Sequence, residues 1–171
     1  MGVVIRHATP NELKLIPAIE LEAGRIFADI MMSEIADNPS LNYEFLTSFT
    51  RHGAVQVAAA DSSRLIGFVL TGFLDGAGHV YEMSVLPDQA QQGIGRKLLD
   101  AACGYAYAKG SRKMTLSTFR DVPWNGPFYL KSGFTVVDRA NWTPALHVLH
   151  EREIMSGLDV SRRCFMEKTL S

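Results

Sequence analysis

The sequence predicts a single α/β (α+β) domain, residues 1–171, in which helices cover both faces of a mixed sheet. Two stretches with helical spacing come early in the chain, three β-rich stretches follow, and helices and strands then alternate to the end. This order predicts about seven strands, mostly antiparallel. At 171 residues the chain has the length of one domain and can bury a core without a disulfide or a metal.

The first part of the chain combines a short strand with two helices. Thr9-Pro10-Asn11-Glu12 is typical of a helix start, with a cap, a proline in the first turn and an acid three places on. Pro17 lies inside the following helical pattern and is expected to kink or divide it. The expected elements are a strand at Val3–Arg6, a helix from Glu12 to about Phe27, a break at Asp37–Ser40 and a helix at Leu41–Phe49.

Three strands come next. Ala54–Ala60 and Leu65–Phe73 flank the turn Asp61-Ser62-Ser63, which predicts a hairpin. Gly76-Ala77-Gly78 ends this pair, and His79–Leu86 is predicted to be the third strand, closed by a proline.

The period of the apolar residues changes to 3.6 between Gly93 and Lys109, which predicts a helix capped by Gly110. Its expected buried face consists of Ile94, Leu98, Ala101, Ala102 and Tyr105. The elements expected after it are a strand at Met114–Phe119, a short helix at Asn125–Lys131, a strand at Phe134–Asp138, a helix from Thr143 to about Met155 and a strand at Arg163–Lys168.

Composition excludes several classes of partner. The 17 basic and 18 acidic residues give a net charge of −1, so the chain has no basic footprint for nucleic acid or acidic lipid. No apolar run approaches the length of a membrane span, and the first residues do not form a signal peptide. Cys103 and Cys164 lack the spacing of a zinc site or of a secreted disulfide framework. We therefore expect a cytoplasmic protein with no metal, no nucleic acid and no membrane among its partners.

The most informative segment runs from Val85 to Leu99. A strand stops at Pro87, a polar turn follows, and a helix begins at Gly93-Ile94-Gly95. Glycines let the backbone approach a ligand, and the unpaired amides of a first helical turn bind anions such as phosphate. A P-loop would need Lys-Ser/Thr after the last glycine, and a dinucleotide fingerprint would need a small residue where Leu98 stands. On these residues alone, a strand–turn–helix corner packed through its glycines explains the pattern equally well.

The surrounding residues decide between these alternatives. Val85-Leu86-Pro87 followed by Gly93-Ile94-Gly95-Arg96 resembles motif A of the GNAT family of N-acetyltransferases, whose pattern is Gln/Arg-x-x-Gly-x-Gly/Ala. Some thirty residues later, Tyr129-Leu130-Lys131-Ser132-Gly133-Phe134 resembles the Tyr-x-x-x-Gly-Phe signature of that family. The resemblance covers the whole order of elements and implies the acyl-CoA N-acyltransferase fold, with acetyl-CoA as co-substrate.

The sequence departs from the family pattern at three positions. Ala90 stands where the family has Gln or Arg, and Gln91 stands where it often has glycine, although glutamine takes a positive φ less readily. Val122 stands where the family often has asparagine, while Asn125 lies three residues later. The side chain of Asn125 is expected either to hydrogen-bond the pantetheine arm or to cap the short helix.

The resemblance implies how the donor binds. Two parallel strands, ending near Val85 and Phe119, would splay apart, and pantetheine would pair with main-chain groups there like an added strand. The predicted cofactor-binding residues are Met83, Ser84, Val85, Gln91, Gln92, Gly93, Ile94, Gly95, Arg96 and Asn125.

Acetyl transfer to an amine needs a base, an oxyanion donor and an acid. Glu82 is the candidate base and the amide of Val85 the candidate donor. Tyr129 matches the family tyrosine that protonates the leaving thiolate. The alternative for Glu82 is a strand carboxylate that pairs with a surface cation. The alternative for Tyr129 is a tyrosine that only packs.

Other polar and aromatic residues are weaker candidates. His79 and Tyr81 are candidates for proton relay, and Trp124 and Trp142 for the acceptor pocket, although core packing explains such residues more often. The acids of Glu20–Phe27 are expected to attract a cationic amine or to form an exposed helical face.

Two functions are consistent with this sequence. The first is an N-acetyltransferase acting on a primary amine of a small molecule, or else on a protein N-terminus or lysine. The second is an acyl-CoA-binding sensor without turnover. The presence of both Glu82 and Tyr129 favours the enzyme, since a binder needs neither. A homodimer is expected only because dimers are common in such enzymes.

Overall fold

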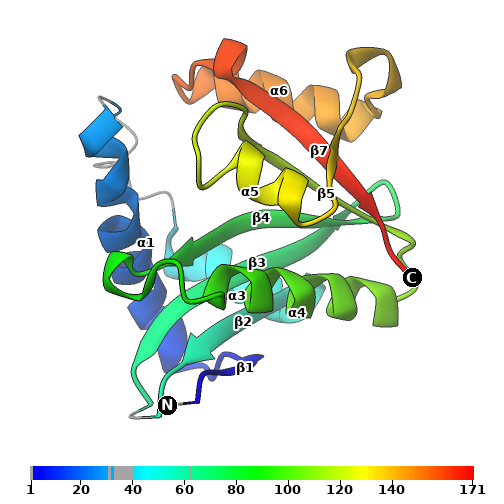
Figure 1. Ribbon diagram of the computed structural model, residues 1–171. Helices are drawn as coiled ribbons and strands as arrows, with labels where there is room; N and C mark the ends of the chain where they lie inside the picture. The colour runs from blue at the N-terminus through cyan, green and yellow to red at the C-terminus, as the bar shows by residue number, and fades with distance from the viewer. Residues whose placement is uncertain (1, 31, 33–40, 62) are drawn as a thin grey trace. The chain divides into compact units, whose positions relative to one another are not determined.

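A computed structural model describes residues 2–30, 32, 41–61 and 63–171. The strands form one seven-stranded sheet in the order β1-β2-β3-β4-β5-β7-β6, in which β4 and β5 run parallel and the pairs β1–β2, β2–β3, β5–β7 and β6–β7 are antiparallel (Figure 1). This confirms the predicted fold class. The strands are β1 (Val4–His7), β2 (Ala54–Ala59), β3 (Leu65–Leu74), β4 (Ala77–Val85), β5 (Lys113–Phe119), β6 (Thr135–Val136) and β7 (Arg163–Thr169).

The chain divides into two compact units. The first comprises residues 1–72 and 81–105, and the second comprises residues 73–80 and 106–171. Strands β3 and β4 each have residues in both units. Among the described residues, no helix is both long and apolar enough to cross a membrane.

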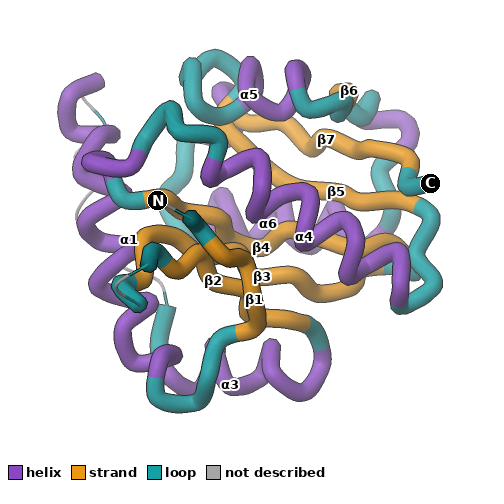
Figure 2. The backbone as a smooth tube through the Cα atoms, turned by 60° about the horizontal axis from the view of Figure 1, so that its bottom comes forward, coloured by secondary structure: helices purple, strands orange, loops and turns teal. Residues whose placement is uncertain are grey.

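In the first unit, helices α3 (Tyr43–His52) and α4 (Ile94–Ala108) lie on opposite sides of β2 and β3 (Figures 1 and 2). A β carbon on Gly67 of β3 would lie 3.2 Å from Leu98 of α4, and one on Gly72 would lie 3.4 Å from Phe49 of α3. Since successive strand residues point to opposite faces, positions 67 and 72 face opposite sides. The Tyr105 hydroxyl also donates to the Gly53 carbonyl at 2.7 Å, which holds α4 against the start of β2.

The predicted N-terminal helix is divided at Pro17, as expected. A 3₁₀ turn at Glu12–Leu15 precedes α1 (Ile16–Gly24), in which Pro17 lies in the first turn, and a second 3₁₀ segment, Arg25–Ile30, follows. Glu12 accepts a hydrogen bond from the Thr9 amide at 2.8 Å, but the turn begins after Asn11 without a side-chain cap, so the predicted cap at Thr9 is wrong. The break predicted at Asp37–Ser40 lies outside the described residues. Helix α3 begins two residues later than expected because Asn42 caps it, accepting from the Phe45 amide at 2.8 Å.

In the second unit, α6 (Pro144–Met155) and α5 (Gly126–Lys131) cover opposite faces of the β5–β7 pair. Phe165 of β7 belongs to an apolar cluster with Leu146 of α6. Lys168, an odd number of residues further along β7, donates instead to the carbonyl of Ser132, which ends α5. The register of the two strands places Thr115 opposite Glu167.

Three local predictions need correction. Strand β4 begins at Ala77 because Asp75 and Gly76, with φ of 50° and 80°, form the tight turn of the β3–β4 hairpin. The strand expected at residues 134–138 is only Thr135–Val136, since the chain then turns inward and buries Val137 against α6. The buried face of α4 includes Leu99 and Ala106, whereas Ala101 and Tyr105 are only half-buried.

Candidate functional site

The predicted anion loop leaves the end of β4 and enters α4 within the first unit. Pro87–Gln89 form one 3₁₀ turn, and the chain then passes through two positions with positive φ, 61° at Gln91 and 76° at Gly93. Gln91 therefore adopts the left-handed conformation that the family usually reserves for glycine at this place. The loop is open, because residues 90–93 are exposed and no atom lies within 4 Å of a β carbon placed on Gly93.

The main-chain amides of this loop are available to a ligand. The first backbone bond of the helix runs from the Lys97 amide to the Gly93 carbonyl at 3.1 Å. For the amides of residues 91–96, the described part of the chain provides no protein acceptor. Six such donors at the positive end of a 15-residue helix form an anion site, and the two positive φ values curve the backbone into a nest. The prediction that main-chain nitrogens can receive a diphosphate here is supported by this geometry.

Two arginines beside the loop are already paired with acids. Arg96 pairs with Asp100 at 3.1 Å, and Arg64 pairs with Asp88 at 3.1 Å. All four side chains are 49–56% exposed, so these pairs contribute little to stability. An anion in the loop would therefore be bound chiefly by the backbone, which explains why a side chain as small as Ala90 is tolerated there.

The candidate base, Glu82, is half-buried on β4 in the same unit. The Ser84 hydroxyl donates to Glu82 Oε1 at 3.4 Å, a contact that sequence analysis did not identify. Beyond the strand, the Leu86 amide donates to the Ile66 carbonyl of β3 at 2.9 Å. Because successive amides of an extended chain point in opposite directions, the Val85 amide points away from β3. This orientation suits the predicted oxyanion donor.

The regular alternation of β4 is interrupted around Glu82. A β carbon on Gly72 would lie 2.7 Å from the Tyr81 ring, whereas one on Gly67 would lie 3.3 Å from Val85. Gly67 and Gly72 face opposite sides of the sheet, so Tyr81 and Val85 do so as well, although four residues separate them. Irregularities of this kind re-aim side chains and are frequent beside active sites.

Close approach at Gly67 fixes the position of this segment. A β carbon on Gly67 would lie only 2.8 Å from the carbonyl oxygen of Ser84, which no side chain tolerates without a backbone shift. A glycine inside an apolar strand is the one sequence signal that indicates such an approach.

Two predicted site residues, Asn125 and Tyr129, lie in the second unit. Asn125 precedes α5, but its side chain makes no capping bond, and its Oδ1 accepts from the Thr118 hydroxyl at 2.8 Å. The capping alternative is therefore wrong for the side chain. Tyr129 is 8% exposed, and its ring packs against Phe128 and Phe134 at centroid distances of 5.1 and 5.8 Å. Its backbone anchors the turn after α5, since its carbonyl accepts from the Ser132 and Phe134 amides.

Two of the weaker candidates, Tyr81 and Trp142, pack against other aromatic rings. The Tyr81 ring contacts Phe49 at 5.1 Å, and Trp142 packs edge-on against Phe165 at 4.8 Å. Trp124 is 38% exposed. Glu20 accepts from the Leu41 amide at 3.3 Å, so this acid contributes to the structure around α1.

His79 is buried in the second unit and is held by a polar neighbour. Thr115 donates from its hydroxyl to the Gly78 carbonyl at 3.2 Å, and His79 Nδ1 lies 2.8 Å from the same hydroxyl oxygen. The Thr115 hydroxyl thus links the His79 ring to the backbone of β4. Burial lowers the pKa of His79 to about 4, so the ring is uncharged at neutral pH. A structural role therefore replaces the proposed proton relay.

The lowered pKa of His79 predicts that the free energy of unfolding decreases at acid pH. The folded-state pKa of about 4 lies below the ordinary value of 6.5, so the unfolded chain takes up the proton first as the pH falls. The stability contributed by neutral His79 is present above pH 6.5 and is lost progressively down to pH 4. Between pH 7 and pH 5 the loss should be about 2 kcal/mol. Urea unfolding of wild type and His79→Gln at both pH values tests this, because the variant should lack this part of the pH dependence. Equal slopes for the two proteins would contradict it.

Comparison with known proteins agrees with this geometry. A profile of the acetyltransferase (GNAT) domain matches residues 51–136, half of the chain. The structure is similar to that of the PaiA N-acetyltransferase from Thermoplasma acidophilum in complex with coenzyme A, with 21% identity, 99% of each chain covered and a TM-score of 0.72. It is also similar to a GNAT acetyltransferase from Staphylococcus aureus, with 15% identity, 99% of this chain and 100% of that chain covered and a TM-score of 0.74. N-acetylglutamate synthase from Neisseria gonorrhoeae, complexed with coenzyme A and N-acetyl-glutamate, matches all of this chain with 36% of its own at 15% identity and a TM-score of 0.70. At identities this low, the similarity in structure establishes a shared fold.

Proposed function

The chain belongs to the GNAT family and uses acetyl-CoA as its acetyl donor, and on this basis we propose that it is an N-acetyltransferase for a primary amine of a small molecule. The observation that carries the proposal is the set of six available amides at the start of α4, in the same unit as Glu82 and Val85. These amides would bind the diphosphate of the donor. Main-chain groups at Met83–Val85 would pair with pantetheine. The side chain of Asn125 stays a further predicted contact to the pantetheine arm.

The reaction proposed is direct attack within a ternary complex. An alkylamine has a pKa near 10, so at pH 7 only about one molecule in a thousand is neutral, and a base must take its proton. Glu82 would accept that proton, directly or through water, as the nitrogen forms a bond to the thioester carbon. The Val85 amide would donate to the developing oxyanion. The C–S bond then breaks, and Tyr129 would give its proton to the leaving thiolate.

Two arms of one experiment test this proposal. Saturating acetyl-CoA should raise the melting temperature of the protein, because a ligand that binds only the folded state stabilises it. Release of CoA should then be followed over a panel of amino acids, polyamines, aminoglycosides and peptides. Turnover with a small amine alone supports the proposal, whereas turnover only with peptides assigns a protein acceptor. Stabilisation without any turnover would favour a sensor, and no stabilisation at high excess would overturn the site itself.

A further inference from the structure

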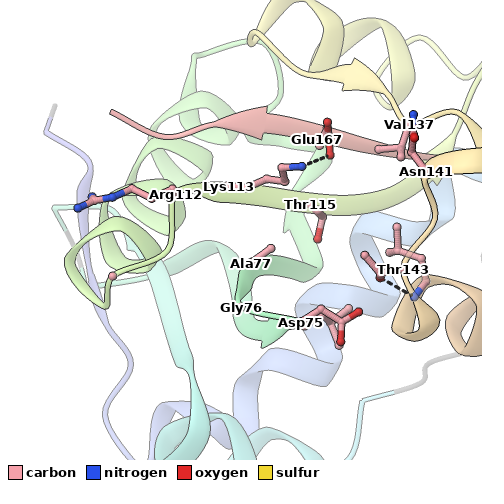
Figure 3. A pocket seen from close by; sticks show the side chains of 13 residues that line it. Asp75, Gly76, Ala77, Arg112, Lys113, Thr115, Val137, Asn141, Thr143 and Glu167 are labelled. Atoms are coloured by element: carbon pink, nitrogen blue, oxygen red, sulfur yellow. Dashed lines mark hydrogen bonds and ion pairs between the residues drawn. The ribbon is translucent and has the colours of Figure 1, made fainter.

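A cavity of about 370 Å³ lies wholly within the second unit. It is bounded by the β3–β4 turn, the first residues of β5 and the start of α6 (Figure 3). Its volume falls in the range of sites for small organic ligands, about 300–1,000 Å³. Its apolar lining includes Leu74, Val137 and Leu146.

The lining of this cavity includes two acids and two bases, and one of the bases is directed away from the other polar side chains. Asp75 and Glu167 contribute two acids, and Lys113 contributes one base, which pairs with Glu167 Oε2 at 2.8 Å (Figure 3). A second base, Arg112, lines the cavity, but its guanidinium lies over the Tyr107 ring at 4.6 Å, and Figure 3 shows it extending away from the other labelled side chains. The two acids and Lys113 leave an excess of one negative charge.

The carboxylate of Asp75 keeps capacity for a ligand. One oxygen, Oδ2, accepts from the Ala145 amide in the first turn of α6 at 3.3 Å. Within the described residues, Oδ1 accepts no hydrogen bond. A carboxylate offers about four lone-pair sites, so Asp75 can receive a further donor without losing this bond.

The neutral polar groups of the cavity are largely satisfied within the protein. Thr143 accepts from the Leu146 amide at 3.4 Å, and the Thr115 hydroxyl donates to the carbonyl of Gly78. The α6 terminus cannot serve an anion either, because Pro144 has no amide hydrogen and the amides of Ala145 and Leu146 are already bonded. Asp75 Oδ1 is thus a negatively charged acceptor that the cavity can offer to a ligand.

We propose that this cavity binds a small organic cation, namely a primary alkylammonium with a short aliphatic body. The ammonium would donate to Asp75, and the aliphatic part would cover Leu74, Val137 and Leu146. No residue that lines this cavity is among those proposed for acetyl transfer or donor binding. Thr115 lies four residues before Phe119, the end of β5, which is about 13 Å along the strand.

Binding of 1-aminobutane to the full chain tests this proposal, followed by amide chemical shifts with butan-1-ol and butyrate as neutral and anionic probes of equal length. The amine should bind saturably and shift the amides of Ala77 and Thr115. The alcohol should bind more weakly, and butyrate should not bind. Asp75→Asn should weaken amine binding at least about tenfold, because a charge-assisted hydrogen bond is lost. Asparagine also tolerates the positive φ of this position, so the turn is preserved.

Two further variants fix the sign of the recognised charge. Glu167→Gln should weaken amine binding because it leaves Lys113 uncompensated, whereas Lys113→Met should strengthen binding because it releases Glu167. Glu151→Gln, which removes an exposed acid of α6 outside the cavity, is the matched control and should change nothing. The proposal is overturned if butyrate binds better than the amine, if Lys113→Met weakens the amine, or if Asp75→Asn leaves the affinity intact. The last result would place the amine at another site, such as that of the acetyl acceptor.

Discussion

Replacing Glu82 with glutamine is expected to lower kcat about a hundredfold or more while the affinity for acetyl-CoA changes less than about twofold. Glutamine keeps the size of the side chain and can still accept from the Ser84 hydroxyl, which lies 3.4 Å from Glu82 Oε1. It cannot accept a proton from the attacking amine. The rate of CoA release with an acceptor from the panel measures kcat, and calorimetry measures donor affinity.

Control variants separate loss of the base from a general disturbance. Glu44→Gln removes an exposed acid of α3 in the same unit and should keep full activity. Tyr129→Phe keeps the ring that packs on Phe134 but removes the proton donor, so it should lower kcat without loss of donor affinity. Full activity in both Glu82→Gln and Tyr129→Phe would show that the catalytic assignment is wrong.

Local sequence rules predicted the elements whose ends are set by neighbouring residues. Helix α6 begins at Pro144, with Thr143 as its cap, as the sequence indicates. Helix α4 ends before Gly110, whose φ of 95° allows the amide of Ser111 to reach the carbonyl of Ala106. Helix caps and helical periodicity depend on residues that are close in sequence. Tertiary contacts therefore did not alter the bounds of these two helices.

The anion loop was predicted as a whole, but its conformation at Gln91 was not. The sequence shows a glutamine where the family has glycine, and residue type alone argues against a positive φ at that place. The structure keeps the left-handed turn, with φ of 61°. A cost of about 1–2 kcal/mol for such a residue is evidently offset by the rest of the loop.

Contacts between distant segments could not be predicted. The approach of Gly67 to Ser84, the interruption of β4 and the cavity beside Asp75 each depend on the sheet register and on which helix covers which face. The periodicity of apolar residues predicts that a segment is a strand, but it does not predict which other strand pairs with it. The site could therefore be assigned to named residues from sequence, while their geometry required the fold.

Two glycines of the α4 region give the last prediction, because the same substitution should act on them in opposite directions. Neither Gly93 nor Gly104 has an atom within 4 Å of its would-be β carbon, so space does not distinguish them. Gly93 has a φ of 76°, whereas Gly104 lies inside α4 with no positive φ. Gly93→Ala should therefore destabilise the protein by about 1 kcal/mol, and Gly104→Ala should stabilise it by about 0.5–1 kcal/mol.

The two substitutions should also differ in their effect on the affinity for acetyl-CoA. Alanine at position 93 favours a negative φ, which would turn the neighbouring amides out of the nest, so the affinity for acetyl-CoA should fall about tenfold. Alanine at position 104, about ten residues further along the helix, should leave affinity unchanged. Urea unfolding and calorimetry on both variants measure these quantities. If Gly93→Ala binds acetyl-CoA as tightly as Gly104→Ala does, the expected dependence of donor binding on the left-handed conformation at position 93 is contradicted.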